Sequence, residues 1–262
     1  MPNKTNKTGS QYRLHNTGLI TDFNSPQADA IIRLQTNIDF ASVEKKITCF
    51  AVTSAQEAEG KTTTSCNLAL VYAEKGLKVC LLDFDLRQPA INKVFNVKND
   101  LGIVDYVKGD CEIDDIIKHV DKIDLITPGS HTPFPSKVLG SEKTIQLINE
   151  LKSRYDYVII DTPPVLVVSD AYLIGQIVDG FLLVCSQHIS KKKDVVAACR
   201  SLEEKRMNIL GISMCMVTTD EDNGKGGYGY ATKYGYNYGY GYKYGGYHSN
   251  KKEKLGKKKE DK

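Results

Sequence analysis

Gly60, Lys61 and Thr62 are the residues whose types and spacing point most directly to chemistry. In the pattern G-x-x-x-x-G-K-[ST], loop amides hold nucleotide phosphates, the lysine reaches the β- and γ-phosphates, and the hydroxyl binds Mg²⁺. The first glycine of that pattern is Ala55 in this chain, so Gly-Lys-Thr is the firm part. An ordinary strand–helix turn with a solvated lysine is the alternative. The triplet alone therefore suggests a phosphate site without deciding it.

Carboxylates at the ends of two apolar runs favour a nucleotide site. One run ends in Asp83-x-Asp85-x-Arg87, and another reaches Asp161, which Thr-Pro-Pro follows. Continuous apolar runs are typical of parallel strands that are buried on both faces. Because ligands bind outside the carboxyl ends of such strands, we expect these side chains to meet Lys61 at one edge of a sheet. A structural pair that caps the next helix is the alternative for the two neighbouring aspartates.

The elements that must position these residues can be predicted from the pattern of apolar residues. Strands are expected at Ile47–Thr53, Lys78–Leu82, Leu125–Thr127, Tyr157–Ile160, Phe181–Cys185 and Ile209–Val217. Helices are expected at Ala28–Phe40 after Ser25-Pro26, at about Thr62–Lys75 with Gly76 as the stop, at Glu142–Lys152, near Ala171 and at Asp194–Lys205. The residues between the second and third strands form a polar middle region. This alternation predicts an α/β fold with a parallel sheet and helices on both faces.

The three motifs, in this order, resemble those of bacterial tyrosine kinases. Ser54–Ala69 is similar to their Walker A segment, Leu81–Arg87 to their Walker A′ motif and Ile159–Pro164 to their Walker B motif. The resemblance covers about residues 20–247 and implies a P-loop NTPase-like fold with a mostly parallel sheet. Asp-x-Asp-x-Arg separates this family from the partitioning and division-site ATPases. Those ATPases usually carry a lysine early in the loop, where this chain has Gln56 and Glu57.

The resemblance implies ATP and Mg²⁺ as cofactors and assigns roles to individual residues. We expect the nucleotide to be bound by Glu59, Gly60, Lys61, Thr62, Thr63 and Arg87, and the metal by Thr62, Asp83, Asp85 and Asp161. The catalytic residues are then Lys61, Asp83 and Asp85. By resemblance Asp83 is the base and Asp85 the metal-binding or orienting group, although the spacing alone does not separate them.

The C-terminal part of the chain contains a cluster of candidate phosphate acceptors. Nine of the fifteen tyrosines lie within twenty residues and alternate mainly with glycine: Tyr228, Tyr230, Tyr234, Tyr236, Tyr238, Tyr240, Tyr242, Tyr244 and Tyr247. Glycine at this density predicts a disordered segment that can reach an active site. The family carries a similar cluster, which it phosphorylates on itself. A low-complexity tail that associates through its aromatic rings is the alternative.

Three departures from the family pattern bear on the predicted site and assembly. Relatives have Pro-Gly where this chain has Glu57–Ala58, which predicts slower turnover or weaker ATP binding. Relatives also close a subunit ring through Glu-x-x-Arg-x-x-Arg on an early helix, and the matching positions hold Asp29, Ile32 and Gln35. Cys215 stands where relatives place an adenine-binding asparagine, so the adenine contacts are unassigned.

Composition predicts one domain with tails. We expect a flexible segment at residues 1–25, a kinase domain at 26–218 and a disordered tail at 219–262, whose last twelve residues hold seven lysines and three acids. A net charge of +3 argues against a nucleic-acid partner. The seven scattered cysteines are typical of reduced core residues, and no signal peptide or membrane span is apparent.

The main functional hypothesis is an ATP-dependent protein-tyrosine kinase that phosphorylates its own tail and regulates capsular or extracellular polysaccharide synthesis. By resemblance it lies in the cytoplasm, at the inner face of the membrane. There it would bind a transmembrane adaptor of the polysaccharide co-polymerase type, further copies of itself and external protein substrates. The alternatives are a partitioning-type ATPase and a non-catalytic, ATP-dependent scaffold.

Overall fold

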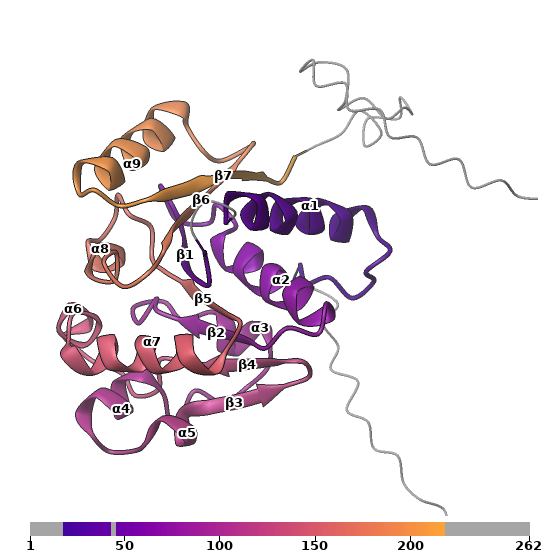
Figure 1. Ribbon diagram of the computed structural model, residues 1–262. Coiled ribbons are helices and arrows are strands. Elements are labelled where there is room, and N and C mark those ends of the chain that lie inside the picture. The colour runs from indigo at the N-terminus through magenta and orange to yellow at the C-terminus, as the bar shows by residue number, and fades with distance from the viewer. Residues whose placement is uncertain (1–17, 43–45, 218–262) are drawn as a thin grey trace, which may run out of the picture. The chain divides into compact units, whose positions relative to one another are not determined.

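A mostly parallel sheet forms the centre of the part of the chain that the structure describes (Figure 1). The computed structural model describes residues 18–42 and 46–217. Within these residues seven strands follow the order β3-β4-β2-β5-β1-β6-β7, and all neighbours are parallel except β3 and β4. The strands are β1 (Cys49–Ser54), β2 (Val79–Asp83), β3 (Ile117–Val120), β4 (Ile123–Ile126), β5 (Tyr157–Asp161), β6 (Gly180–Ser186) and β7 (Ile209–Cys215). This architecture confirms the predicted fold class.

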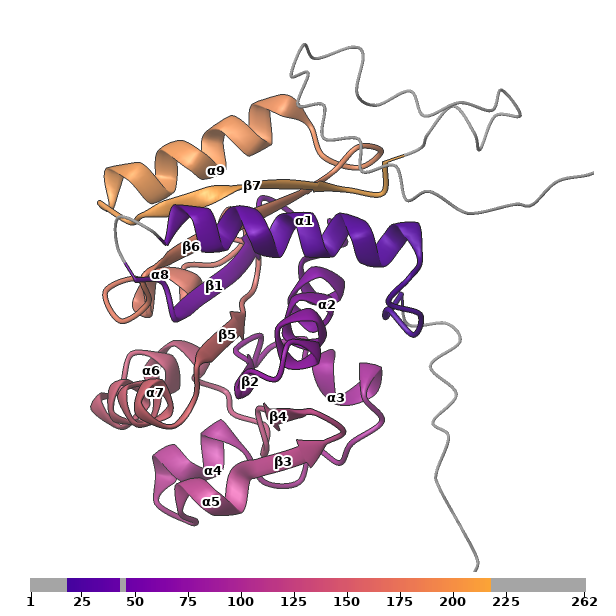
Figure 2. The same cartoon turned by 45° about the vertical axis from the view of Figure 1, so that its right-hand side comes forward.

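Helices cover both faces of the sheet, as Figure 2 shows. One face carries α1 (Pro26–Ala41), α2 (Lys61–Glu74) and α3 (Ile91–Val94). The other carries α4 (Ile103–Lys108), α5 (Ile113–Ile116), α6 (Pro135–Leu139), α7 (Glu142–Arg154), α8 (Asp170–Leu173) and α9 (Lys192–Glu204). Strand side chains alternate between the two resulting cores, so Phe50 packs toward α2 whereas Ala51 packs toward the opposite layer. Both faces of the central strands are buried, which explains their continuous apolar sequence.

Helix α1 begins as its sequence predicts. The Ser25 hydroxyl accepts the N–H of Ala28, and Pro26 occupies the first turn. Near the other end of the helix, the Asp39 carboxylate accepts the hydroxyls of Tyr72 and Tyr157, each at 3.1 Å. These contacts fix α1 against α2 and β5.

Gln35 is buried beside this contact, although the family pattern places a subunit-contacting arginine at the matching position. Its amide donates to Asp39 and accepts from Lys75. The Gln35 side chain therefore connects α1 to Lys75, the residue after α2, within the same subunit.

The predicted polar middle region is more structured than its sequence suggests, since it contains α3, α4, α5 and β3. Strand β3 pairs with β4 through a turn at Asp121–Lys122, where Asp121 has φ +51°. The turn lacks the Asn-Gly or Asp-Gly pair that is typical of tight hairpins, and β3 is only partly buried. The pattern of apolar residues therefore does not predict this hairpin.

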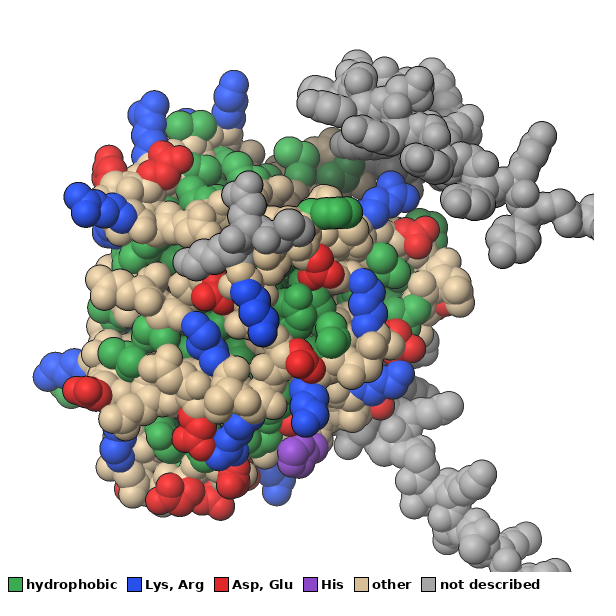
Figure 3. All heavy atoms as spheres, viewed as in Figure 1, with side chains coloured by type: hydrophobic (Ala, Val, Ile, Leu, Met, Phe, Trp, Pro, Cys, Tyr) green, Lys and Arg blue, Asp and Glu red, His purple; other side chains and the backbone are tan. Residues whose placement is uncertain are grey.

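The predicted tyrosine cluster 228–247 and the lysine-rich end 251–262 lie outside the described residues, as does most of the predicted N-terminal segment. In the described part of the chain, no helix combines the length and apolar character needed to cross a bilayer. All seven cysteines are free, and Cys49, Cys66, Cys80 and Cys185 are buried in the core. On the face seen in Figure 3, acidic and basic side chains are interspersed, so this face has no broad area of one sign.

Candidate active site

The loop between β1 and α2 is shaped by Glu59. Its buried carboxylate accepts the N–H of Gln56 at 2.8 Å and also the hydroxyl of Ser190. Sequence reasoning assigned Glu59 to the nucleotide. In the structure the Glu59 side chain stabilises the loop through these two hydrogen bonds. Only its backbone N–H is then left to contact a phosphate.

Gly60 is required at the start of α2 for two reasons. Its φ of +89° lies in the left-handed region, and a Cβ there would lie 2.7 Å from the Cys215 sulfur. The Cys215 thiol donates to the Glu59 carbonyl at 3.0 Å. Cys215, which stands at the expected adenine-contacting position, therefore packs directly against the phosphate loop.

Ala58 has φ +60°, a conformation that costs a residue with a Cβ roughly 1–2 kcal/mol. Ala58→Gly removes that strain but adds freedom to the unfolded chain, so we expect a net gain of about 0.5–1 kcal/mol in the free energy of unfolding. Thermal melting should show a rise of about 1–3 °C. Gly60→Ala is the matched control and should lower the melting temperature, because its Cβ would clash. A lower melting temperature for Ala58→Gly would show that Ala58 is unstrained.

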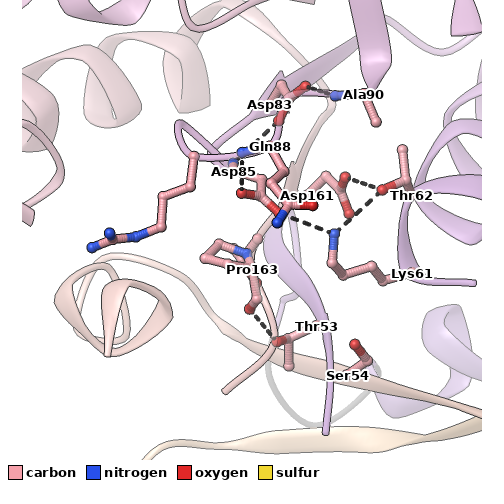
Figure 4. A network of polar contacts seen from close by, with 12 residues as sticks. Thr53, Ser54, Lys61, Thr62, Asp83, Asp85, Gln88, Ala90, Asp161 and Pro163 are labelled. Atoms are coloured by element: carbon pink, nitrogen blue, oxygen red, sulfur yellow. Dashed lines mark hydrogen bonds and ion pairs between the residues drawn. The ribbon is translucent and has the colours of Figure 1, made fainter. Parts of the chain in front are cut away.

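Three segments bring polar side chains together, as Figure 4 shows: Lys61 and Thr62 begin α2, Asp85 follows β2, and Asp161 ends β5. The Thr62 hydroxyl donates to Asp161 at 2.6 Å, and the Lys61 ammonium lies 3.3 Å from the Asp85 carboxylate. Burial disfavours the charged ammonium, but Asp161 and Asp85 outweigh it and raise the pKa of Lys61. Lys61 is therefore a permanent cation at this position.

Ser65 belongs to the same cluster, although sequence reasoning missed it. Its hydroxyl bonds the second oxygen of Asp161 at 3.1 Å. Ser65 lies one helical turn beyond Lys61 and Thr62, and that spacing could have identified it. Thr63 follows Thr62 in the first turn of α2 and is half-buried.

Asp83 and Asp85 occupy different environments. Strand β2 ends at Asp83, so Asp85 lies in the following loop. One Asp83 oxygen accepts the N–H groups of Ala90 and Ile91 at 3.0 Å, and the other accepts the N–H of Asp85 at 3.1 Å. Asp83 thus makes the helix-capping contacts that were the structural alternative, whereas Asp85 faces Lys61.

Burial and the nearby Asp161 raise the pKa of Asp83 to about 7, against the opposing effect of the Ile91 and Ala90 N–H groups. In the unfolded chain an aspartate titrates near 4. Between about pH 4 and pH 7 the Asp83 carboxyl therefore binds a proton in the folded state but not in the unfolded state. This proton binding stabilises the folded state at low pH. The stabilisation decreases as the pH rises from about 4 to 7 and is lost above about 7.

Melting curves of the metal-free protein in chelator should show this titration of Asp83. Relative to Asp83→Asn, which cannot titrate, the wild type should lose on the order of 2 kcal/mol between pH 5 and pH 8. A difference between the two proteins that is constant with pH would show that Asp83 is ionised throughout.

Arg87 is directed to a different partner from the one expected. Its guanidinium donates twice to Asp170 of α8, at 2.7 and 3.3 Å, and Asp170 also accepts the Ser136 hydroxyl at 2.7 Å. Asp170 is buried and was not identified from the sequence. Nucleotide contact by Arg87 stays a prediction.

An open pocket of about 200 Å³ adjoins Lys61 and Asp85. It lies between the phosphate loop, the loop after β2 and the loop after β5, and is lined by Glu57, Ala58, Lys61, Asp85, Arg87, Gln88, Ala90, Pro163, Pro164, Val167 and Val168. A larger cavity of about 480 Å³, between residues 19–23, α2 and the β3–β4 turn, contains none of the predicted site residues.

Comparison with known proteins identifies the family. A model described as "AAA domain" matches residues 47–178. The tyrosine-protein kinase YwqD of Bacillus subtilis is 34% identical over 197 residues, which cover 74% of this chain and 83% of that protein. The chain belongs to the bacterial tyrosine-protein kinases. This membership confirms the family and the class of enzyme predicted from the three motifs.

Solved structures place this bacterial tyrosine kinase within a wider fold group. The kinase domain of Escherichia coli tyrosine kinase ETK aligns with a TM-score of 0.69 and 34% identity, covering 74% of this chain and 78% of that one. The septum site-determining protein MinD of Pyrococcus horikoshii, solved with Mg-ADP, aligns with a TM-score of 0.54 and 24% identity, covering 63% and 68%. The likeness to MinD concerns the fold alone.

Proposed function

We propose that the site around Lys61 transfers the γ-phosphoryl group of ATP to tyrosine hydroxyls, including those of the chain's own tail. The observation that carries this proposal is the meeting of Lys61, Thr62, Asp85 and Asp161 beside an open pocket. The nine tyrosines of residues 228–247 supply acceptors in the same chain.

The residues fit a nucleotide with Mg²⁺. Backbone amides at the start of α2 and the Lys61 ammonium supply positive charge for phosphates. Hydroxyl and carboxylate oxygens of Thr62 and Asp161 are hard donors at 2.6 Å from each other, and Mg²⁺ is commonly held by one or two such groups together with phosphate oxygens and water. Among the described residues no three carboxylates, thiols or imidazoles form a ready metal site. Bound Mg²⁺ would neutralise charge on the phosphates during transfer.

Asp85 is our candidate for the group that orients and deprotonates the acceptor. A tyrosine hydroxyl has an ordinary pKa of about 10, so a nearby carboxylate assists its attack. Asp85 lines the pocket, whereas both oxygens of Asp83 accept backbone N–H groups. In this arrangement Asp83 stabilises the loop that contains Asp85.

A partitioning-type ATPase is the second candidate because the MinD fold is shared. Such ATPases usually have an early loop lysine, which this chain replaces with Gln56 and Glu57. The pocket beside Asp85 also offers room for an acceptor other than water. Both features favour the kinase.

Polysaccharide synthesis is the process we propose that this kinase regulates, at the inner face of the membrane and together with external protein substrates. Its activator would be the cytoplasmic end of a transmembrane adaptor of the polysaccharide co-polymerase type. We expect low phosphorylation by the purified chain and a rise when the adaptor peptide is added, measured as phosphotyrosine per chain. Full activity of the chain alone would contradict this dependence.

Replacement of the nine tail tyrosines by phenylalanine tests the proposed acceptors. Incubation with ATP and Mg²⁺ should label the wild type and leave the variant nearly unlabelled, because the phosphorylated hydroxyls are gone. Equal phosphotyrosine in both proteins would place the acceptors elsewhere in the chain.

A further inference from the structure

Glu57 is an unpaired negative charge on the wall of the proposed acceptor pocket. Its side chain is exposed, and it has no hydrogen bond or ion pair with any residue in the described part of the chain. The two cations of the same pocket have other partners, since Lys61 pairs with Asp85 and Arg87 with Asp170. A cation that arrives with a ligand can therefore pair with Glu57 without competing with Lys61 or Arg87.

The pocket has an apolar side and a charged side. Pro163, Pro164, Val167 and Val168 form an apolar wall, and Val167 is 48% exposed. A phenol ring can pack on this wall while its hydroxyl approaches Asp85. Glu57 lines the same pocket and is exposed, so it is accessible to the residues that flank the tyrosine.

The chain's own acceptor segment has the complementary charge. Residues 228–247 contain two lysines and no aspartate or glutamate; Lys233 precedes Tyr234, and Lys243 stands between Tyr242 and Tyr244. A carboxylate beside the phosphate loop repels a polyphosphate, so its presence is more readily explained by attraction to the second substrate.

We infer that Glu57 selects the acceptor: the pocket favours tyrosines next to lysine over tyrosines next to aspartate or glutamate. This inference rests on the proposed phosphotransfer to tyrosine and extends it by naming the class of acceptor. Glu57 is a specificity residue and takes no part in the bond changes.

The test compares two acceptor peptides that correspond to residues 238–247. Both keep Tyr244 and have phenylalanine at the other tyrosine positions, and one carries Lys243→Glu. The enzyme is the full chain whose nine tail tyrosines are phenylalanine, so that it does not compete as a substrate. Initial rates give kcat/KM for each peptide, and the KM for ATP is measured in parallel.

We expect the lysine peptide to be preferred about three- to tenfold, the range for an exposed charge contact changed from attraction to repulsion. Glu57→Gln should bring the ratio close to one, and Glu57→Lys should reverse it. Higher salt should reduce the preference, because exposed charges are screened. Glu204→Gln, at an exposed position on α9, should keep the wild-type ratio.

An unchanged peptide ratio in Glu57→Gln and Glu57→Lys would overturn the inference, even if the KM for ATP changes. All assays contain the adaptor peptide. Absence of phosphate transfer to either peptide by any of the proteins under these conditions would instead overturn the proposed kinase reaction itself, and the inference with it.

Discussion

Lys61→Met is expected to lower phosphorylation of the tail by at least about 10²–10³-fold, the typical loss when one preorganised charge-stabilising group is removed. The Lys61 ammonium lies within 3.3 Å of Asp85 and is held charged by Asp85 and Asp161. Methionine keeps the length and apolar stem of the side chain but removes the cation that would neutralise the phosphates. Phosphotyrosine per chain after incubation with ATP and Mg²⁺ measures the loss.

The fold of the Lys61→Met protein should persist, because Lys61 lies at the start of α2 and does not belong to either apolar core. Lys193→Met, at an exposed position on α9, is the matched control and should leave phosphorylation unchanged. Circular dichroism and thermal melting check both proteins. Undiminished phosphotyrosine in folded Lys61→Met would remove Lys61 from the site.

Asp85→Asn is expected to lower phosphate transfer by about 10²–10⁴-fold, the usual contribution of a general base, with a much smaller effect on nucleotide affinity. The amide cannot accept the tyrosine proton, although its oxygen can still accept the Gln88 N–H that Asp85 binds at 3.0 Å. Single-turnover rates and the dissociation constant of ADP with Mg²⁺ separate the two effects. Equal loss of both would favour a metal-binding role for Asp85.

Asp83→Asn is the paired variant in this comparison. Asparagine can accept from Ala90 and Ile91 but meets the Asp85 N–H with a donor, so the loop should loosen and both transfer and melting temperature should fall moderately. If Asp83→Asn abolished transfer while Asp85→Asn did not, Asp83 would be the base, as the family resemblance suggests.

The parts of the fold that could be predicted from sequence are those in which local pattern and burial agree. Central strands such as β5 (Tyr157–Asp161), which is buried from Val158 onward, carry unbroken apolar runs. Helix α1 begins at a Ser-Pro pair that caps it through short-range contacts. The α3–α5 region was missed because its helices are short and β3 is only partly buried, so little periodicity is present.

The predicted convergence of Lys61, Asp85 and Asp161 follows from strand order, but the individual side-chain partners do not. Asp83 and Asp85 differ because β2 ends between them, and a spacing of two residues does not reveal that end. The Arg87–Asp170 pair joins segments 83 residues apart, and no local pattern marks it. Glu59 supports the loop because Ser190 approaches it from the loop after β6, which is also a tertiary contact.

Intact-mass measurement after incubation with ATP and Mg²⁺, with ADP release followed in the same sample, tests the central claim most directly. We expect mass increments of one phosphate each, up to nine if every tail tyrosine is modified. Peptide mapping should place these phosphates in residues 228–247. In samples that contain the adaptor peptide, release of ADP without any gain in mass would contradict the kinase and indicate an ATPase, and the absence of both would indicate a scaffold.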